Sequence, residues 1–123
     1  AKYDGINLIS LGGAFNPATS SFVGIFAQQA LSDLRITKAF LCATGVTVES
    51  GMSNTTFLEA EIKRGVVSHA SSVILVADDS KLGHDATVTF CRLQDISTFV
   101  TDQKPAPKFV EFCRAHNIRL IWE

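Results

Sequence analysis

The sequence has no long apolar segment and no concentration of charge of one sign. A helix that crosses a membrane needs about 18 or more consecutive apolar residues, and no stretch of the chain comes near that length. The first residues, Ala-Lys-Tyr-Asp, do not resemble a signal peptide. These absences predict a soluble protein of the cytoplasm with no membrane partner.

Positive charge is also scarce. The 11 lysines and arginines are balanced by 12 aspartates and glutamates, the formal net charge is -1, and the largest basic cluster is the pair Lys63-Arg64. A domain that binds the DNA backbone by itself normally has a basic face. We therefore expect that nucleic acid is not a direct ligand of this chain.

Patterns that hold metals, disulfides or dinucleotides are missing as well. The three cysteines, Cys42, Cys91 and Cys113, form no Cys-x-x-Cys pair. Cys42 and Cys91 lie in apolar stretches, so we expect buried free thiols in a reducing compartment. The three histidines have no second ligand at metal spacing, and no Gly-x-Gly-x-x-Gly segment occurs. The sequence therefore predicts no metal and no cofactor.

What the sequence does contain is enough apolar material for one compact domain. Of its 123 residues 46% are hydrophobic, and there is no linker or repeat, so residues 1–123 are predicted to be a single domain. Helical patterns cover residues 22–34 and 58–70, and a last helix follows Pro107. The predicted strands alternate with these helices and cover residues 6–10, 37–43, 73–77, 99–101 and 118–121. This alternation predicts an α/β fold with a mostly parallel sheet flanked by helices.

The helices carry further expectations. A hydroxyl from residues 19–21 is expected to cap the first helix, and Thr55 or Thr56 the second. Residues 44–51 are expected to form a loop, and Trp122 and the phenylalanines are expected in the core. The apolar positions that recur at helical spacing in the first helix should form part of its buried face: Phe22, Phe26, Ala30 and Leu34.

The most informative segment follows the predicted strand at residues 73–77, where an apolar run ends in charged residues. Open α/β sheets bind ligands at the carboxyl ends of their strands. Lys81 could present its charge to a phosphate, or it could be a solvated turn lysine paired with Asp78 or Asp79. Asp78 could accept a hydrogen bond from a sugar hydroxyl or hold Lys81, or it could cap the turn that follows.

Other candidates carry the same two interpretations. Gly12, Gly13 and Gly45 end predicted strands, where the backbone can approach a ligand or simply make a tight turn. Glu59 and Lys63 stand four residues apart on the second helix. They could face the cleft, or they could form a surface ion pair worth about 0.3–0.5 kcal/mol.

A series of short motifs runs along nearly the whole chain. They are Leu11-Gly12-Gly13, Ser21-Phe22-Val23-Gly24, Lys38-Ala39-Phe40-Leu41, Ala43-Thr44-Gly45-Val46, Gly51 with Glu59-Ala60-Glu61-Ile62-Lys63-Arg64, Asp78-Asp79-Ser80-Lys81-Leu82-Gly83, Leu93-Gln94-Asp95-Ile96 and Val100-Thr101-Asp102. In this order they resemble the C-terminal effector-sensing domain of the DeoR family of sugar-responsive transcriptional regulators.

The resemblance implies the fold of ribose-5-phosphate isomerase, glucosamine-6-phosphate deaminase and the coenzyme A transferases. It implies a sensor for a phosphorylated sugar or related metabolite, most simply in a repressor of carbohydrate metabolism. Members are implied to be oligomers and to bind DNA through a separate helix-turn-helix. The residues that match the family and that we expect to bind the effector are Lys81, Asp78, Gly45, Gly12, Gly13, Glu59 and Lys63.

Two parts of the family pattern have no counterpart in the chain, namely the helix-turn-helix and the first strand of the sensor with its Gly-Thr-Thr loop. The chain therefore looks like the C-terminal part of a longer, N-terminally truncated regulator. Loss of that strand should leave a sheet edge open, which favours self-association. Gly65 and His84 also stand where the family usually has larger or more basic residues.

The alternative to a sensor is a sugar-phosphate isomerase or deaminase on the same fold. An isomerase needs a positioned base. The enzymatic relatives carry several acids after the second strand, whereas residues 43–47 contain no titratable group. Asp78, Glu59 and Lys81 could in principle do acid/base work, but the missing acids favour a protein that is not an enzyme.

Overall fold

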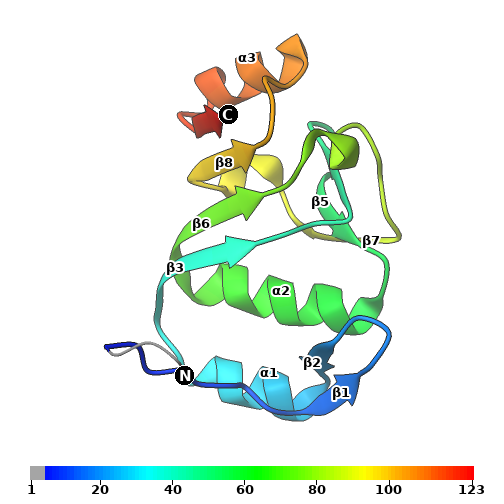
Figure 1. Cartoon of the computed structure of the whole chain (residues 1–123), viewed down its shortest axis with the longest axis vertical. Helices are drawn as coiled ribbons and strands as arrows, with labels where there is room; N and C mark the ends of the chain where they lie inside the picture. Colours follow the sequence, from blue (N-terminus) through cyan, green and yellow to red (C-terminus); the bar gives the residue numbers. More distant parts are fainter. Residues whose placement is uncertain (1–4) are drawn as a thin grey trace.

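The computed structural model describes residues 5–123 and contains one parallel sheet, two smaller antiparallel sheets and three α-helices (Figure 1). The helices are α1 (Ile25–Ser32), α2 (Phe57–His69) and α3 (Pro107–Ala115), with short 3₁₀ turns η1 (Asp79–Lys81) and η2 (Leu93–Asp95). The strands are β1 (Ala14–Asn16), β2 (Ser21–Val23), β3 (Ile36–Leu41), β4 (Gly45–Thr47), β5 (Gly51–Asn54), β6 (Ala70–Val76), β7 (Val88–Cys91), β8 (Thr98–Thr101) and β9 (Arg119–Trp122). None of the described helices is long and apolar enough to span a bilayer.

The main sheet has four strands in the order β3-β6-β8-β9, and every neighbouring pair is parallel. This confirms the predicted α/β class and the predicted strands at residues 37–43, 73–77, 99–101 and 118–121, with ends shifted by at most three residues. The register pairs Leu41 with Leu75, so β3 and β6 end side by side at their carboxyl ends. The sheet therefore presents one edge at which residues after β3 and β6 can meet.

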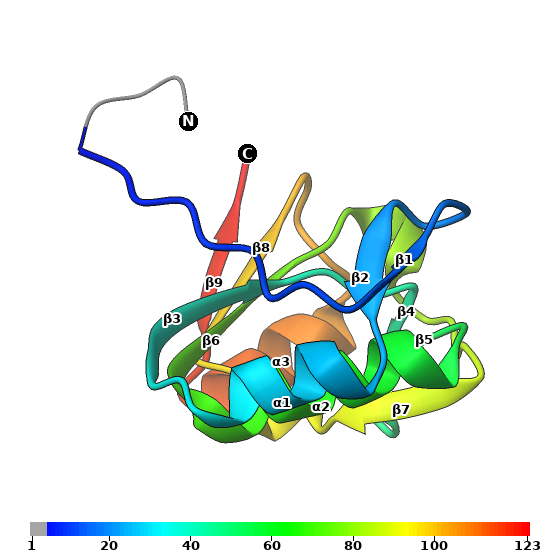
Figure 2. The same ribbon diagram turned by 90° about the horizontal axis from the view of Figure 1, so that it is seen from below.

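All three helices lie on one side of the main sheet (Figure 2). The strands alternate accordingly, because Leu41, Leu75 and Phe99 are buried in the core beneath the helices. The other face is open, and its Phe40 side chain is 69% exposed. Parallel sheets are usually covered on both faces, so a face that the described residues leave uncovered is unusual.

The predicted strand at residues 6–10 is wrong. These residues form no strand, and the side chains of Leu8 and Ile9 are both 80% exposed. An apolar run becomes a strand only when a neighbouring strand satisfies its backbone groups, and no described strand lies beside it. Composition alone could not reveal that absence.

The start of the first helix was also predicted wrongly. Residues 21–23 form β2, which pairs with β1 in an antiparallel ladder, and α1 begins after Gly24. Gly24 has φ 93° and supplies no side-chain cap, so no hydroxyl from residues 19–21 caps α1. The buried stripe is the neighbouring one, Ala27 and Leu31, whereas Phe26 is 71% exposed.

The predicted loop at residues 44–51 contains regular structure. β4 and β5 form an antiparallel hairpin, and β7 completes a three-stranded sheet in the order β4-β5-β7. The short strands are rich in glycine and polar residues, which are uncommon in strands, so tertiary packing overrides local preference here.

Several burial expectations were wrong as well. Cys42 is exposed, while Cys91 and Cys113 are buried free thiols. Trp122 is 43% exposed, and five phenylalanines are exposed. These are Phe15, Phe22, Phe26, Phe40 and Phe57. Two other expectations were correct: Thr56 caps α2 through its side chain, and the last helix, α3, begins at Pro107 and buries Phe109.

Candidate functional site

Polar side chains gather where β3 and β5 end and α2 begins, on the right of Figure 1. Asn54, the last residue of β5, is almost fully buried, and its side chain forms hydrogen bonds with both Glu59 and Lys63. Its Nδ2 donates to Glu59 Oε2 over 2.6 Å, and its Oδ1 accepts from Lys63 Nζ over 2.9 Å. The Asn54 amide thus holds a carboxylate and an ammonium group at fixed positions beside the sheet.

Glu59 lies in the first turn of α2, where its backbone N–H donates to the Thr56 hydroxyl over 3.4 Å. The positive end of the helix dipole stabilises a carboxylate there. Only one carboxylate oxygen is used within the described chain, since Oε1 is buried and has no hydrogen-bond partner. Such an oxygen usually requires a donor, and this makes Glu59 the least satisfied group of the cluster.

Lys63, in contrast to Glu59, has partners for most of its hydrogen-bond donors. Its Nζ donates to the carbonyl oxygen of Cys42 over 2.7 Å and lies 5.3 Å from the centre of the Phe90 ring. Burial lowers the pKa of Lys63, and the negative charge of Glu59 partly offsets that effect. The simple surface ion pair between Glu59 and Lys63 is not formed, because Asn54 lies between them.

A cavity of about 280 Å³ adjoins this cluster. It lies between α2 and the hairpin of β1 and β2, and its walls include both hydroxyls and apolar surface. The lining residues are Thr19, Ser21, Phe22, Val23, Glu59, Ile62 and Lys63. Thr19 and Ser21 share a hydrogen bond of 2.6 Å between their hydroxyl oxygens.

The second predicted cluster follows β6, next to the end of β3. Asp78 caps η1 by accepting hydrogen bonds from the backbone N–H of Ser80, at 3.0 Å, and from its hydroxyl. The bond from the Ser80 hydroxyl is the main reason that the pKa of Asp78 is lowered. Asp78 therefore has the structural role foreseen for it, that of capping the turn.

Lys81 ends η1 and is half-buried. Within residues 5–123 its ammonium group has no ion pair or side-chain hydrogen bond, so it is not paired with Asp78 or Asp79. Lys81 does not line the cavity that contains Glu59. The structure thus places the predicted charged residues in two groups, at the ends of the neighbouring strands β3 and β6.

The three predicted glycines have different surroundings. Gly12 has φ 75° and open space where a side chain would lie, and Gly13 has φ 103° with the carbonyl of Val23 close by. Gly45 is buried in β4, and a Cβ there would lie 2.2 Å from the carbonyl oxygen of His84. Close packing of two backbones explains glycine at position 45 without a ligand.

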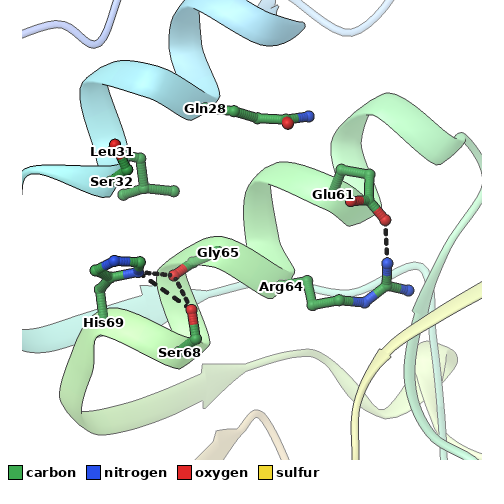
Figure 3. Close-up of a pocket in the computed structure, with 8 residues that line it drawn as sticks. All are labelled: Gln28, Leu31, Ser32, Glu61, Arg64, Gly65, Ser68 and His69. Carbon is green, nitrogen blue, oxygen red and sulfur yellow. Dashed lines mark hydrogen bonds and ion pairs between the residues drawn. The ribbon is translucent and has the colours of Figure 1, made fainter.

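A larger hollow of about 410 Å³ lies between α1 and α2 and contains none of the predicted site residues (Figure 3). Its charged groups are already matched, since Glu61 pairs with Arg64, and Arg64 also donates to the carbonyl of Thr89 over 2.8 Å. His69 Nδ1 lies 2.9 Å from the carbonyl of Gly65. The charged side chains of the groove are thus already paired and none of the predicted site residues lines it, so we do not assign the site to it.

Sequence reasoning missed Asn54, Thr19 and Ser21. Asn54 is an amide at the end of a strand, but the strand itself was not predicted. The sequence predicts Thr19 and Ser21 as candidate capping residues, because nothing in their spacing indicates that the hairpin of β1 and β2 faces α2. No group of three or more histidine, cysteine or acidic side chains suited to a metal occurs in residues 5–123.

The family model of the DeoR C terminal sensor domain matches residues 1–103 of this chain. The chain belongs to the DeoR family. The HTH-type transcriptional regulator IolR of Bacillus subtilis is 36% identical over 113 residues, which are 92% of this chain and 45% of that protein. The similarity confirms the family expected from the motifs.

Two further relatives support the same family. The lactose phosphotransferase system repressor of Staphylococcus epidermidis is 34% identical over 99 residues, covering 80% of this chain and 39% of that repressor. The HTH-type transcriptional regulator GlpR of Haloferax volcanii is 36% identical over 91 residues, covering 74% and 36%. The chain spans less than half the length of these relatives. Their names are those of regulators and a repressor, which favours the sensor over the enzyme alternative.

Proposed function

We propose that this domain binds a phosphorylated sugar and, as part of a longer cytoplasmic regulator, transmits that binding to a DNA-binding domain. The family match and a relative named as a lactose phosphotransferase system repressor support a role in repressing carbohydrate metabolism. The near-neutral charge of the chain supports DNA binding by another part of the polypeptide.

The single observation that carries the proposal is the pair of polar clusters at the carboxyl ends of adjacent parallel strands. Lys81 supplies the unpaired positive charge that a phosphate needs, and Asp78 fixes the turn that presents it. Glu59 and Lys63 form the second cluster with Asn54. Gly12, Gly13 and Gly45 complete the proposed effector-binding set through their backbone.

The test uses the intact regulator that contains this chain. Thermal-shift screening of sugar phosphates identifies the effector, and operator binding is then titrated with it by fluorescence anisotropy. Removing the cationic partner of a desolvated phosphate costs about 2–5 kcal/mol, so Lys81→Ala should weaken the effector response roughly 30-fold or more without changing operator affinity.

Lys108→Ala is the matched control, because Lys108 is exposed and its ion pair with Glu49 lies at the surface. It should change effector affinity by less than about twofold, as expected for a surface ion pair. Asp78→Asn should weaken the response less than Lys81→Ala. An unaltered effector affinity in Lys81→Ala would remove Lys81 from the site.

We also propose that the protein self-associates. β3 is an edge strand of the main sheet in the described residues, and the face of this sheet opposite the helices is uncovered. That face contains a hollow of about 330 Å³ whose walls include Phe40, Val100 and Ile121. An open edge beside a face that exposes apolar side chains such as Phe40 favours pairing with another chain. Light scattering over a tenfold concentration range should give a mass above that of one chain, and a strictly monomeric mass would contradict this.

A further inference from the structure

The carboxylate of Glu59 is half satisfied. Asn54 holds Oε2, whereas Oε1 is buried and has no donor in the described residues. Leaving a buried acceptor without a partner is costly, and more so when it carries charge. Glu59 lines the cavity, and because Oε1 is buried, a molecule in the cavity can donate to it only when the carboxylate turns toward the cavity, which would supply the missing partner.

No described group donates to Oε1 in the conformation observed. Asn54 Nδ2 donates to the other carboxylate oxygen, and Lys63 donates to Asn54 Oδ1 and to the carbonyl of Cys42. These same bonds fix the position of Glu59, because its partner amide is anchored by the lysine. The Glu59 side chain is therefore held beside the cavity that it lines.

The rest of the cavity matches a molecule with hydroxyl groups and C–H faces. Thr19 and Ser21 present hydroxyls, each able to donate and to accept. Phe22, Val23 and Ile62 form apolar wall. Small polyhydroxyl compounds such as sugars and sugar alcohols combine these two kinds of surface.

The charges of the cavity disfavour a phosphate group. The positive charge of Lys63 is balanced by Glu59 and is turned toward the Cys42 carbonyl and the Phe90 ring. A phosphate placed here would lie beside the carboxylate, and like charges repel strongly in a partly desolvated site. The unpaired Lys81 is outside the cavity.

We propose that the cavity bounded by Glu59, Thr19 and Ser21 binds the uncharged, hydroxyl-bearing part of the effector, with Glu59 as the acceptor that determines specificity. The phosphate group lies outside it, toward η1. This inference rests on the proposed sensor function for its biological meaning, but binding at the cavity is measurable separately.

The experiment is amide-resolved NMR of the 123-residue chain titrated with ribitol, sorbitol and, separately, inorganic phosphate. We expect at least one of the two polyols to shift the amides of Thr19, Ser21 and Glu59 in a saturable way, and phosphate to leave these three amides unmoved. Glu59→Gln keeps the shape but removes the charge, and it should weaken polyol binding by roughly fivefold or more, because a hydrogen bond to a charged acceptor is stronger than one to a neutral amide.

The matched control is Glu61→Gln, on the same helix but paired with Arg64 in the other groove. It should leave polyol affinity unchanged within about twofold. Thr19→Ala and Ser21→Ala are a second test independent of the buried network, because both residues lie on the hairpin surface. Each should weaken binding severalfold.

Absence of saturable shifts with both polyols, phosphate shifts centred on Glu59, or an unaltered affinity in Glu59→Gln would each overturn the inference. Polyol binding at Glu59 in a protein whose regulator ignores every sugar phosphate would keep the inference and reject the proposed function. A sugar-phosphate response that is lost in Lys81→Ala but unaffected by Glu59→Gln would do the opposite.

Discussion

Gly45→Ala tests whether glycine is required at position 45 by packing. The Cβ of alanine would lie 2.2 Å from the carbonyl oxygen of His84 and 3.0 Å from the amide nitrogen of Ala86. Ordinary contacts of this kind are near 3.4 Å or longer. Residues 84–86 would therefore have to move by about 1 Å, because backbone atoms cannot turn aside as a flexible side chain can.

Such a movement breaks specific hydrogen bonds. Gly83 N donates to the carbonyl of Val46 over 2.8 Å, and Ala86 N donates to the Ser53 hydroxyl over 2.8 Å. Each bond contributes about 0.5–1.5 kcal/mol, and a buried group left unpaired costs about 1–3 kcal/mol. We therefore expect Gly45→Ala to lower the free energy of unfolding by about 2–4 kcal/mol.

Urea unfolding followed by far-UV circular dichroism measures this change. With a slope of about 1–3 kcal/mol per molar urea, the midpoint should fall by roughly 1 M or more. Gly65→Ala is the control, since its Cβ would meet only the flexible end of Leu31, at 2.8 Å, and alanine favours a helix. It should change stability by less than about 1 kcal/mol. A Gly45→Ala protein within about 0.5 kcal/mol of wild type would refute the packing argument.

Two further predictions concern the core. Burial raises the pKa of Cys91 to about 11 from an ordinary 9.0. The folded state therefore retains a proton that the unfolded chain loses, and at most about 2 kcal/mol of stability, less what solvent screening removes, should disappear as the pH rises from 9 to 11. Cys91→Ala should lose less over that range in urea unfolding, and an equal loss in both proteins would contradict the assignment. Phe99→Ala should lower the free energy of unfolding by about 3–5 kcal/mol, because Phe99 is fully buried on a strand with neighbours on both sides. Phe26→Ala, at a side chain that is 71% exposed, should cost under about 1 kcal/mol by the same measurement, and similar losses in the two variants would show that burial does not set the difference.

The sequence by itself determined the α/β class, the parallel strands and the family. Apolar runs that alternate with helical stretches allow few other arrangements. The motif after β6 indicated where Lys81 and Asp78 lie, because charged residues that follow a buried strand must be at its carboxyl end. The Thr56 cap was also predictable, because it depends only on residues of a single helical turn.

Tertiary structure decided what depends on neighbours distant in sequence. The run at residues 6–10 has strand character but no described partner strand. Residues 44–51 lack strand character, yet β4 and the start of β5 lie there, and β5 pairs with β7. Phe26 and Ala27 are equally compatible with the buried face of α1, and only the position of α2 selects Ala27. The cavity depends on the hairpin of β1 and β2 facing α2, and the orphan oxygen of Glu59 depends on where Asn54 ends β5. Local sequence determines how a residue bonds to its own turn, whereas its burial and its unmet hydrogen bonds are set by segments that the chain brings together only on folding.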